Sequence, residues 1–190
     1  MKLVKILEQK NLKLKLFQGD ITQSGAEVIV NAANKYLEHG GGVAAAIAKA
    51  CVGSTHEYTR ISKEEMLKQI GRNYLEHGEV VVTPAMKLEE KGTKYVIHTV
   101  GPICSGVWND DLKTKLYLAF KAPLEKAEEM KLKTIAFPAV SAGIYGCPIE
   151  EVVRTFLEAV KEFSEKAKNL KEVWLFLFDE NSVKKAEKVW

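Results

Sequence analysis

Short apolar runs of the kind that form strands alternate along this chain with segments that have the periodicity of helices. In residues 12–17 (LKLKLF) leucine alternates with lysine before a final phenylalanine, which predicts a half-buried strand, and residues 3–7 are expected to pair antiparallel with it across a turn near 9–11. Further strands are expected at residues 28–33, 79–83, 95–100, 134–139 and 173–178. Strands that alternate with helices predict an α/β sandwich, with helices on both faces of a mixed sheet.

The helices are expected between these strands, at residues 43–51, 62–71, 109–127, 148–167 and 181–190. The second helix is placed by residues 62–65 (SKEE), which match a capping box, and Pro123 is expected to kink or split the third. The chain has no internal repeat and no linker rich in proline, glycine or serine. We therefore predict a single domain over residues 1–190.

Charge and hydropathy limit the kinds of partner that this chain is expected to have. It has 28 basic and 25 acidic residues, and a formal net charge of +3 gives no support for nucleic acid as a partner. No run reaches the roughly 18 apolar residues of a membrane span, and residues 1–5 lack the pattern of a signal peptide. We expect a soluble, cytoplasmic protein, and a monomer because no oligomer pattern is visible. Lysine supplies 25 of the basic residues and glutamate 21 of the acidic ones, a bias typical of thermophiles.

The cysteines and histidines give no indication of a metal site. Cys51, Cys104 and Cys147 lie far apart and form no CxxC pair, so they are expected to stay reduced in or near the core. The four histidines have no metal-ligand spacing, and no Ser/His/Asp arrangement is visible. The sequence therefore predicts neither a metal nor a cofactor.

Two strand ends carry residues suited to recognising adenine, and ligands of open α/β sheets bind outside the carboxyl ends of strands. Asp20, one of only four aspartates, follows the strand at 12–17. It is either a cap or turn residue, or a carboxylate that accepts a hydrogen bond from the adenine amine. Phe178 ends the last strand and is either a core residue or a platform on which a base stacks.

Two other strand ends carry loops of small residues. Residues 40–43 (GGGV) open a helix whose first N–H groups favour a phosphate, and residues 138–147 (PAVSAGIYGC) form a second such loop before another helix. Two loops at one sheet edge suit a diphosphate, although a plain glycine turn is the alternative for the first. Neither loop has the P-loop or the dinucleotide-binding pattern. The residues therefore indicate a protein that binds an adenine diphosphate.

At these residues the sequence resembles the macro domain family. The matching motifs are, in order, QGDIT at 18–22, VNAAN at 30–34, GGGV at 40–43, HTVGP at 98–102 and PAVSAGIYG at 138–146. They extend over nearly the whole chain, and the resemblance is closest to stand-alone archaeal macro domain proteins. It implies a three-layer α/β/α fold around a mixed, mostly parallel six-stranded sheet. It also implies binding of ADP-ribose, either free or attached to proteins as mono- or poly-ADP-ribose.

The resemblance further implies a role for individual residues. Asp20 would bind the adenine amine, and Ile21 would contact the base and the phosphate through its backbone. Asn34 would lie at the distal ribose together with Tyr145. The other implied contacts are Gly41, Gly42 and Val43 around the distal ribose, Ser141, Ala142, Gly143 and Ile144 at the diphosphate, Phe178 at the adenine, and Asn181 at the proximal ribose.

One departure from the family pattern bears on catalysis. The branch that resembles vigorous mono-ADP-ribosyl hydrolases reads GGGVDGAIH, whereas Ala44 follows the valine here. Because alanine cannot orient or deprotonate a water, binding is the first expectation. The alternative is hydrolysis, which would remove ADP-ribose from acidic side chains or phosphate from ADP-ribose-1″-phosphate, with help from the substrate's own phosphate. Asn34 and Tyr145 are the candidate catalytic residues for this alternative.

Overall fold

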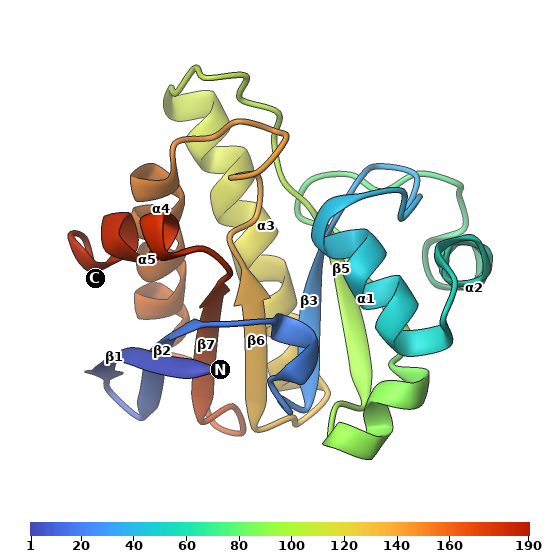
Figure 1. Ribbon diagram of the computed structural model, residues 1–190, viewed down its shortest axis with the longest axis horizontal. Coiled ribbons are helices and arrows are strands. Elements are labelled where there is room, and N and C mark those ends of the chain that lie inside the picture. Colours follow the sequence, from blue (N-terminus) through green and yellow to red (C-terminus); the bar gives the residue numbers. More distant parts are fainter.

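The computed structural model describes residues 1–190 (Figure 1). Its strands are β1 (Lys2–Gln9), β2 (Leu12–Gln18), β3 (Val28–Ala33), β4 (Val81–Pro84), β5 (Tyr95–Val100), β6 (Thr134–Pro138) and β7 (Glu172–Leu177). Its helices are α1 (Gly42–Val52), α2 (Thr55–Ile70), α3 (Asp110–Glu129), α4 (Ile149–Phe163) and α5 (Glu180–Glu187), with short 3₁₀ helices η1 (Ile21–Gln23) and η2 (Met86–Lys91).

All seven strands form one sheet in the order β1-β2-β7-β6-β3-β5-β4. The five inner strands are parallel, while β1 and β4 pair antiparallel at the two edges. The mixed, mostly parallel sheet is as expected, but the six strands that the resemblance implied are one too few. Because the inner strands are parallel, the carboxyl ends of β2, β7, β6, β3 and β5 meet at one edge of the sheet.

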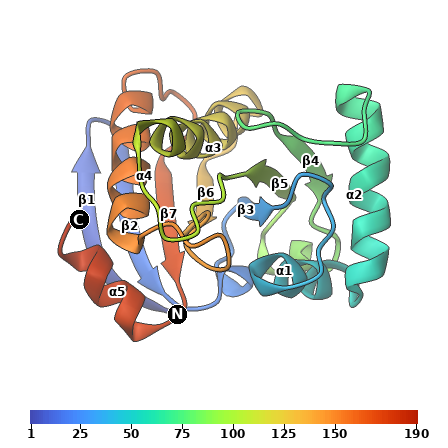
Figure 2. The same ribbon diagram turned by 90° about the horizontal axis from the view of Figure 1, so that it is seen from above.

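Helices cover both faces of this sheet (Figure 2). One face packs against α3, α4 and α5 in a core that contains Leu116, Phe156 and Val183. The other face packs against α1, and α2 lies beside α1 and β4. The leucine–lysine alternation of β2 has the predicted effect, since Leu12, Leu14 and Leu16 all face the first of these cores.

Helix α2 begins earlier than the sequence predicted. Its cap is Ser54, whose side chain accepts a hydrogen bond from the Glu57 backbone N–H at 3.1 Å. Residues 54–57 (STHE) form a capping box as good as residues 62–65, and Gly53, with φ of +77°, ends α1 directly before it. Ser62, the predicted cap, is therefore buried in the middle of the helix.

Pro123 does not split α3, which runs as one helix from Asp110 to Glu129. A proline in a helix leaves the carbonyl four residues earlier without its usual donor. Here that carbonyl belongs to Ala119, and it accepts a hydrogen bond of 2.8 Å from the Thr99 hydroxyl of β5. The strand thus supplies the donor that the proline lacks.

Three further expectations are corrected at the chain's loops and ends. Pro148 is the cap of α4 rather than its first residue, and α4 ends at Phe163 rather than near residue 167. Helix α5 starts after its cap Asp179 and ends at Glu187. Cys104 and Cys147 are not reduced but form a disulfide, whereas Cys51 is free and buried, as expected.

The helices also answer the question of membrane spans. The structure contains no helix with both the length and the apolar character that crossing a bilayer requires.

Candidate functional site

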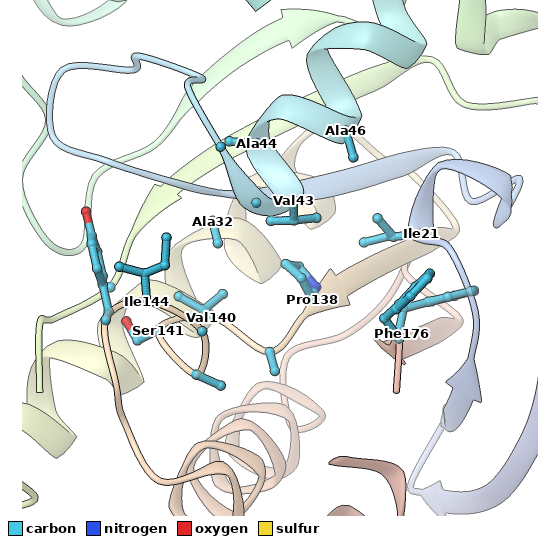
Figure 3. A pocket seen from close by; sticks show the side chains of 18 of the residues that line it. Ile21, Ala32, Val43, Ala44, Ala46, Pro138, Val140, Ser141, Ile144 and Phe176 are labelled. Carbon is cyan, nitrogen blue, oxygen red and sulfur yellow. The ribbon is translucent and has the colours of Figure 1, made fainter. Parts of the chain in front are cut away.

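A cavity of about 810 Å³ opens at the edge where the parallel strands end. Its wall includes the residues that follow β2, β3, β6 and β7, and the N-terminal turn of α1 (Figure 3). In Figure 3, Ile21 and Phe176 lie at one end, and Ser141 and Ile144 lie at the other. The volume falls within the range of about 300–1,000 Å³ that is usual for small-molecule sites.

Asp20 lies at the Phe176 end of the cavity and caps η1. Its Oδ1 accepts hydrogen bonds from the Thr22 backbone N–H at 2.9 Å and from the Thr22 hydroxyl at 2.7 Å. Its Oδ2 has no hydrogen-bond partner within the chain. The two interpretations of Asp20 are therefore compatible, because one oxygen serves the cap and the other is free to accept a ligand donor.

Phe178 belongs to the cavity wall and not to the core. Strand β7 ends at Leu177, one residue earlier than the sequence suggested, and the Phe178 side chain is 80% exposed. Phe176, two residues before it, is buried and stacks on Phe17 with ring centroids 4.9 Å apart. The strand thus places Phe176 beneath this end of the cavity and leaves the ring of Phe178 open to solvent.

The triple glycine forms an open stretch of wall at the start of α1. A Cβ atom added to Gly40, Gly41 or Gly42 would meet no atom within 4 Å. Gly41 caps the helix without a side-chain hydrogen bond, so the first N–H groups of α1 have no side chain to bind them. Such a helix start favours an anion.

The loop of residues 139–147 forms the opposite wall. Ser141 has φ of +67°, and its carbonyl accepts a hydrogen bond from the Cys147 N–H at 2.9 Å, which closes the loop. The loop lies so close to Gly101 that a Cβ there would come within 2.1 Å of Ser141 Oγ. Gly101 is therefore required for the close fit of these two loops.

Two side chains of this loop reach the cavity in different ways. Ile144 is 93% exposed, while Tyr145 is half-buried, and this burial raises the pKa of its hydroxyl. Both line the cavity, as do Ala142 and Gly143.

Asn34 is largely occupied within its own loop. Its Oδ1 accepts hydrogen bonds from the N–H groups of Tyr36 at 3.2 Å and Glu38 at 3.0 Å, and its Nδ2 donates to the Glu38 carbonyl at 2.9 Å. The side chain therefore closes the loop of residues 34–38 and keeps a single N–H without a partner in the chain.

Glu38 is a cavity residue that the sequence did not single out. It lies on the same loop as Asn34, and its Oε2 is 2.9 Å from Lys63 Nζ of α2. The other carboxylates of the wall, Asp20 and Asp179, each cap a helix on a different segment of chain. No local pattern in the sequence singles out Glu38 among the 21 glutamates of the chain.

Asn181 is the one predicted ligand contact that the structure does not place in the cavity wall. It lies in the first turn of α5, where Asp179 and Ser182 line the cavity instead. Its contact with the proximal ribose stays a prediction, as do the roles of the residues that do line the cavity.

A buried polar network lies behind the glycine loop. Asn31 Nδ2 lies 3.0 Å from His98 Nδ1 and 3.4 Å from His39 Nδ1. The His39 Nε2 lies 2.9 Å from the Ser62 hydroxyl. Burial lowers the pKa of both histidines, so both rings are neutral near pH 7. The network fixes His39 directly before the triple glycine.

This network predicts a pH-dependent stability. Burial lowers the pKa of His39 to about 4, and burial and the charge of His39 lower the pKa of His98 well below its usual value. A histidine with a depressed folded-state pKa contributes stability that is present above about pH 6.5 and is lost as the pH falls below it. We expect His39 alone to cost about 2 kcal/mol between pH 7.5 and pH 5.

Thermal denaturation at pH 7.5, 6 and 5 checks this expectation. His39→Gln should flatten the slope of melting temperature against pH, whereas the control His56→Gln should keep it. Equal slopes in wild type and His39→Gln would contradict a neutral buried His39.

Comparison with known proteins gives a consistent result. The profile of the macro domain family matches residues 30–156. A protein of Archaeoglobus fulgidus named ADP-ribose glycohydrolase is 66% identical over 180 residues, which cover 95% of this chain and 93% of that protein. The Oceanobacillus iheyensis macrodomain with ADP has a TM-score of 0.85 at 30% identity and covers 100% of this chain and 96% of its own.

A more distant structure agrees with these two. The Trypanosoma brucei macrodomain in complex with ADP-ribose has a TM-score of 0.74 at 29% identity, and the match covers 92% of this chain and 68% of that one. The family profile covers both small-residue loops of the cavity, and the sequence and structure matches extend over nearly the whole chain. This chain therefore belongs to the macro domain family.

Proposed function

We propose that this protein binds ADP-ribose, either free or attached to proteins as mono- or poly-ADP-ribose, in the cavity at the strand ends. The observation that carries the proposal is the order of groups along the cavity. A free carboxylate oxygen and an exposed aromatic ring lie at one end, and two small-residue loops lie beyond them. Related macrodomains whose structures contain ADP or ADP-ribose support the same ligand.

In this proposal the ligand lies along the cavity with adenine at the Asp20 end. Asp20 Oδ2 accepts the adenine amine, Ile21 contacts the base, and Phe178 stacks on it. The diphosphate lies between the α1 N-terminus, with Gly41, Gly42 and Val43, and the loop of residues 141–145. No lysine or arginine lines the cavity, so backbone N–H groups would meet the phosphate charge.

Titration calorimetry with ADP-ribose, ADP and AMP tests the proposal. We expect one site per chain, and affinities that fall in that order as the distal ribose and then a phosphate are removed. The same titration with inosine-diphosphate ribose should show weaker binding, because hypoxanthine presents a carbonyl to Asp20. No heat and no thermal shift with ADP-ribose would refute the proposal.

Phe178→Ala is expected to weaken ADP-ribose binding about 5- to 150-fold, which corresponds to the roughly 1–3 kcal/mol of one base–aromatic stack. Phe178→Tyr keeps the ring and should bind about as well as wild type. Because Phe178 is exposed, neither change should lower the melting temperature appreciably. Calorimetry and thermal denaturation on the same pair check this. A large loss of stability with unchanged affinity would show that Phe178 supports the fold and does not stack on the ligand.

A second candidate function is hydrolysis of an ADP-ribosyl bond, and the 66% identical relative named ADP-ribose glycohydrolase favours it. Ala44 supplies no base, so a different carboxylate is needed at the Asn34 end of the cavity. Glu38 is the carboxylate that lies there, and its Oε2 forms an ion pair with Lys63 Nζ of α2.

Glu38→Gln is expected to lower the rate of ADP-ribose release from an auto-modified protein by about a hundredfold or more, the usual contribution of a general base, with little change in affinity. Time-resolved release of radiolabelled ADP-ribose measures the rate. Glu64→Gln removes a carboxylate of α2 that pairs with Arg60 and serves as the matched control. Wild-type protein that binds but releases nothing would exclude the second candidate and leave the first intact.

A further inference from the structure

A disulfide joins the loop that follows β5 to the loop of residues 139–147, which forms one wall of the cavity. Cys104 lies in the loop that follows β5, and Cys147 ends the loop of residues 139–147. The two cysteines are 43 residues apart in sequence, and their Cα atoms are 4.9 Å apart. The second loop supplies cavity residues from Ala139 to Tyr145, so the cross-link ends directly behind the wall that faces the ligand.

Backbone hydrogen bonds join the same two loops around the disulfide. The Tyr145 carbonyl accepts bonds from the N–H groups of Cys104 at 2.8 Å and Ser105 at 3.0 Å. The Gly146 carbonyl accepts from the Gly106 N–H at 3.0 Å. The residue that flanks the cavity, Tyr145, is thus held through its own backbone by the loop that carries Cys104.

Little apolar packing holds the tips of these two loops. Ile144, at the tip of the cavity loop, is exposed, and so are Ile103 and Val107 on either side of Cys104. The buried residues of this region include the two cysteines, Pro102, Val140 and Ser141, and Ala142 packs partly against the core. A loop tip with few buried apolar contacts orders poorly unless other constraints hold it, and the cross-link is the covalent one among them.

We propose that Cys104 and Cys147 are positioning residues for ligand binding: their disulfide holds the loop of residues 139–147 in the conformation that receives the diphosphate and distal ribose of ADP-ribose. This proposal rests on the proposed binding function. In the reduced protein the loop must be ordered when the ligand binds, and that ordering weakens affinity. We expect reduction to weaken ADP-ribose binding roughly tenfold.

The reduction is a two-electron step with a defined reductant. A dithiol such as dithiothreitol breaks the Cys104–Cys147 bond, and two S–H groups form while the dithiol closes to its own cyclic disulfide. Both cysteines are buried, with 4% and 3% exposure, so attack on either sulfur requires the loops to open. A ligand that holds the loop closed should therefore slow the reaction.

The first test compares oxidised and dithiol-reduced wild-type protein by titration calorimetry with ADP-ribose. Circular dichroism and thermal denaturation establish that both are folded. Cys104→Ala/Cys147→Ala should bind like the reduced protein and show no further response to dithiol. Cys51→Ala, which removes the buried cysteine outside the disulfide, should keep the full response.

The second test uses wild-type protein only and works even if the double variant does not fold. Linkage requires that ADP-ribose favour the disulfide by the same factor by which the disulfide favours ADP-ribose. In dithiothreitol redox buffers, saturating ADP-ribose should therefore lower the midpoint potential of the pair by about 30 mV for a tenfold coupling. A disulfide that only stabilises the fold would lower the melting temperature on reduction but leave this midpoint unmoved.

The outcomes distinguish failure of the positioning role from failure of the proposed binding function. Equal affinity of the folded reduced and oxidised proteins, or a midpoint that ADP-ribose does not shift, overturns the positioning role. Oxidised protein that fails to bind ADP-ribose at all overturns the proposed function instead.

Discussion

Gly41→Glu is expected to weaken ADP-ribose binding by more than about a hundredfold while the fold stays intact. Gly41 has φ of −164°, an extended conformation that glutamate adopts without strain, and a Cβ there meets no atom within 4 Å. The new carboxylate would lie at the N-terminus of α1, where the helix dipole favours it. It would then occupy the place of the diphosphate, and two like charges about 4 Å apart repel by roughly 4 kcal/mol near a protein surface.

Gly41→Ala is the matched control, because it keeps the backbone and adds no charge, and its affinity should stay within a few-fold of wild type. Gly42→Glu should block the site as well, but Gly42 has φ of +57°, so about 1–2 kcal/mol of backbone strain would complicate that comparison. Calorimetry and thermal denaturation measure both effects. Normal binding by Gly41→Glu would show that the glycine loop is only a turn.

Asp20→Ala is expected to weaken ADP-ribose binding by more than about tenfold, the effect of one hydrogen bond to a charged group. It also removes the cap of η1, so a loss of about 1 kcal/mol in stability is expected. Asp20→Asn separates the two effects, because its amide oxygen still accepts the Thr22 N–H while its charge is gone. We expect Asp20→Asn to keep the stability and lose the affinity.

The base that is recognised provides the sharper readout for Asp20. Wild type should prefer ADP-ribose to inosine-diphosphate ribose, and both Asp20 variants should lose most of this preference. Calorimetric titrations with the two nucleotides measure it. A variant that binds more weakly but keeps the preference would assign adenine recognition to another group.

The strand ends of this fold could be predicted because they follow from local patterns. Leucine and lysine alternate strictly from Leu12 to Leu16, and both Asp20 and Phe178 were expected at strand ends, where open α/β sheets bind their ligands. The orientation of Phe178 was not predictable, because it depends on whether β7 ends at residue 177 or 178. One residue decides whether that ring enters the core or the cavity.

The remaining errors concern contacts between distant segments. The start of α2 was ambiguous because both Ser54 and Ser62 begin a capping-box pattern, and only the end of α1 at Gly53 decides between them. The Cys104–Cys147 pair spans 43 residues and has no local signature. The Thr99 hydroxyl that lets α3 continue through Pro123 also comes from another element, 20 residues before the Ala119 carbonyl that it binds.

The way in which Asn34 is bonded changes how substitutions at this position must be interpreted. Its amide makes three hydrogen bonds that close the loop carrying Glu38. An alanine at this position removes these hydrogen bonds together with any contact to a sugar. Weaker ligand binding by Asn34→Ala would therefore reflect disruption of the loop of residues 34–38 as much as the loss of a ligand contact. Aspartate keeps the oxygen that accepts from Tyr36 and Glu38 but loses the donor to the Glu38 carbonyl and adds a charge, so the stability of any variant at this position must be measured together with its affinity.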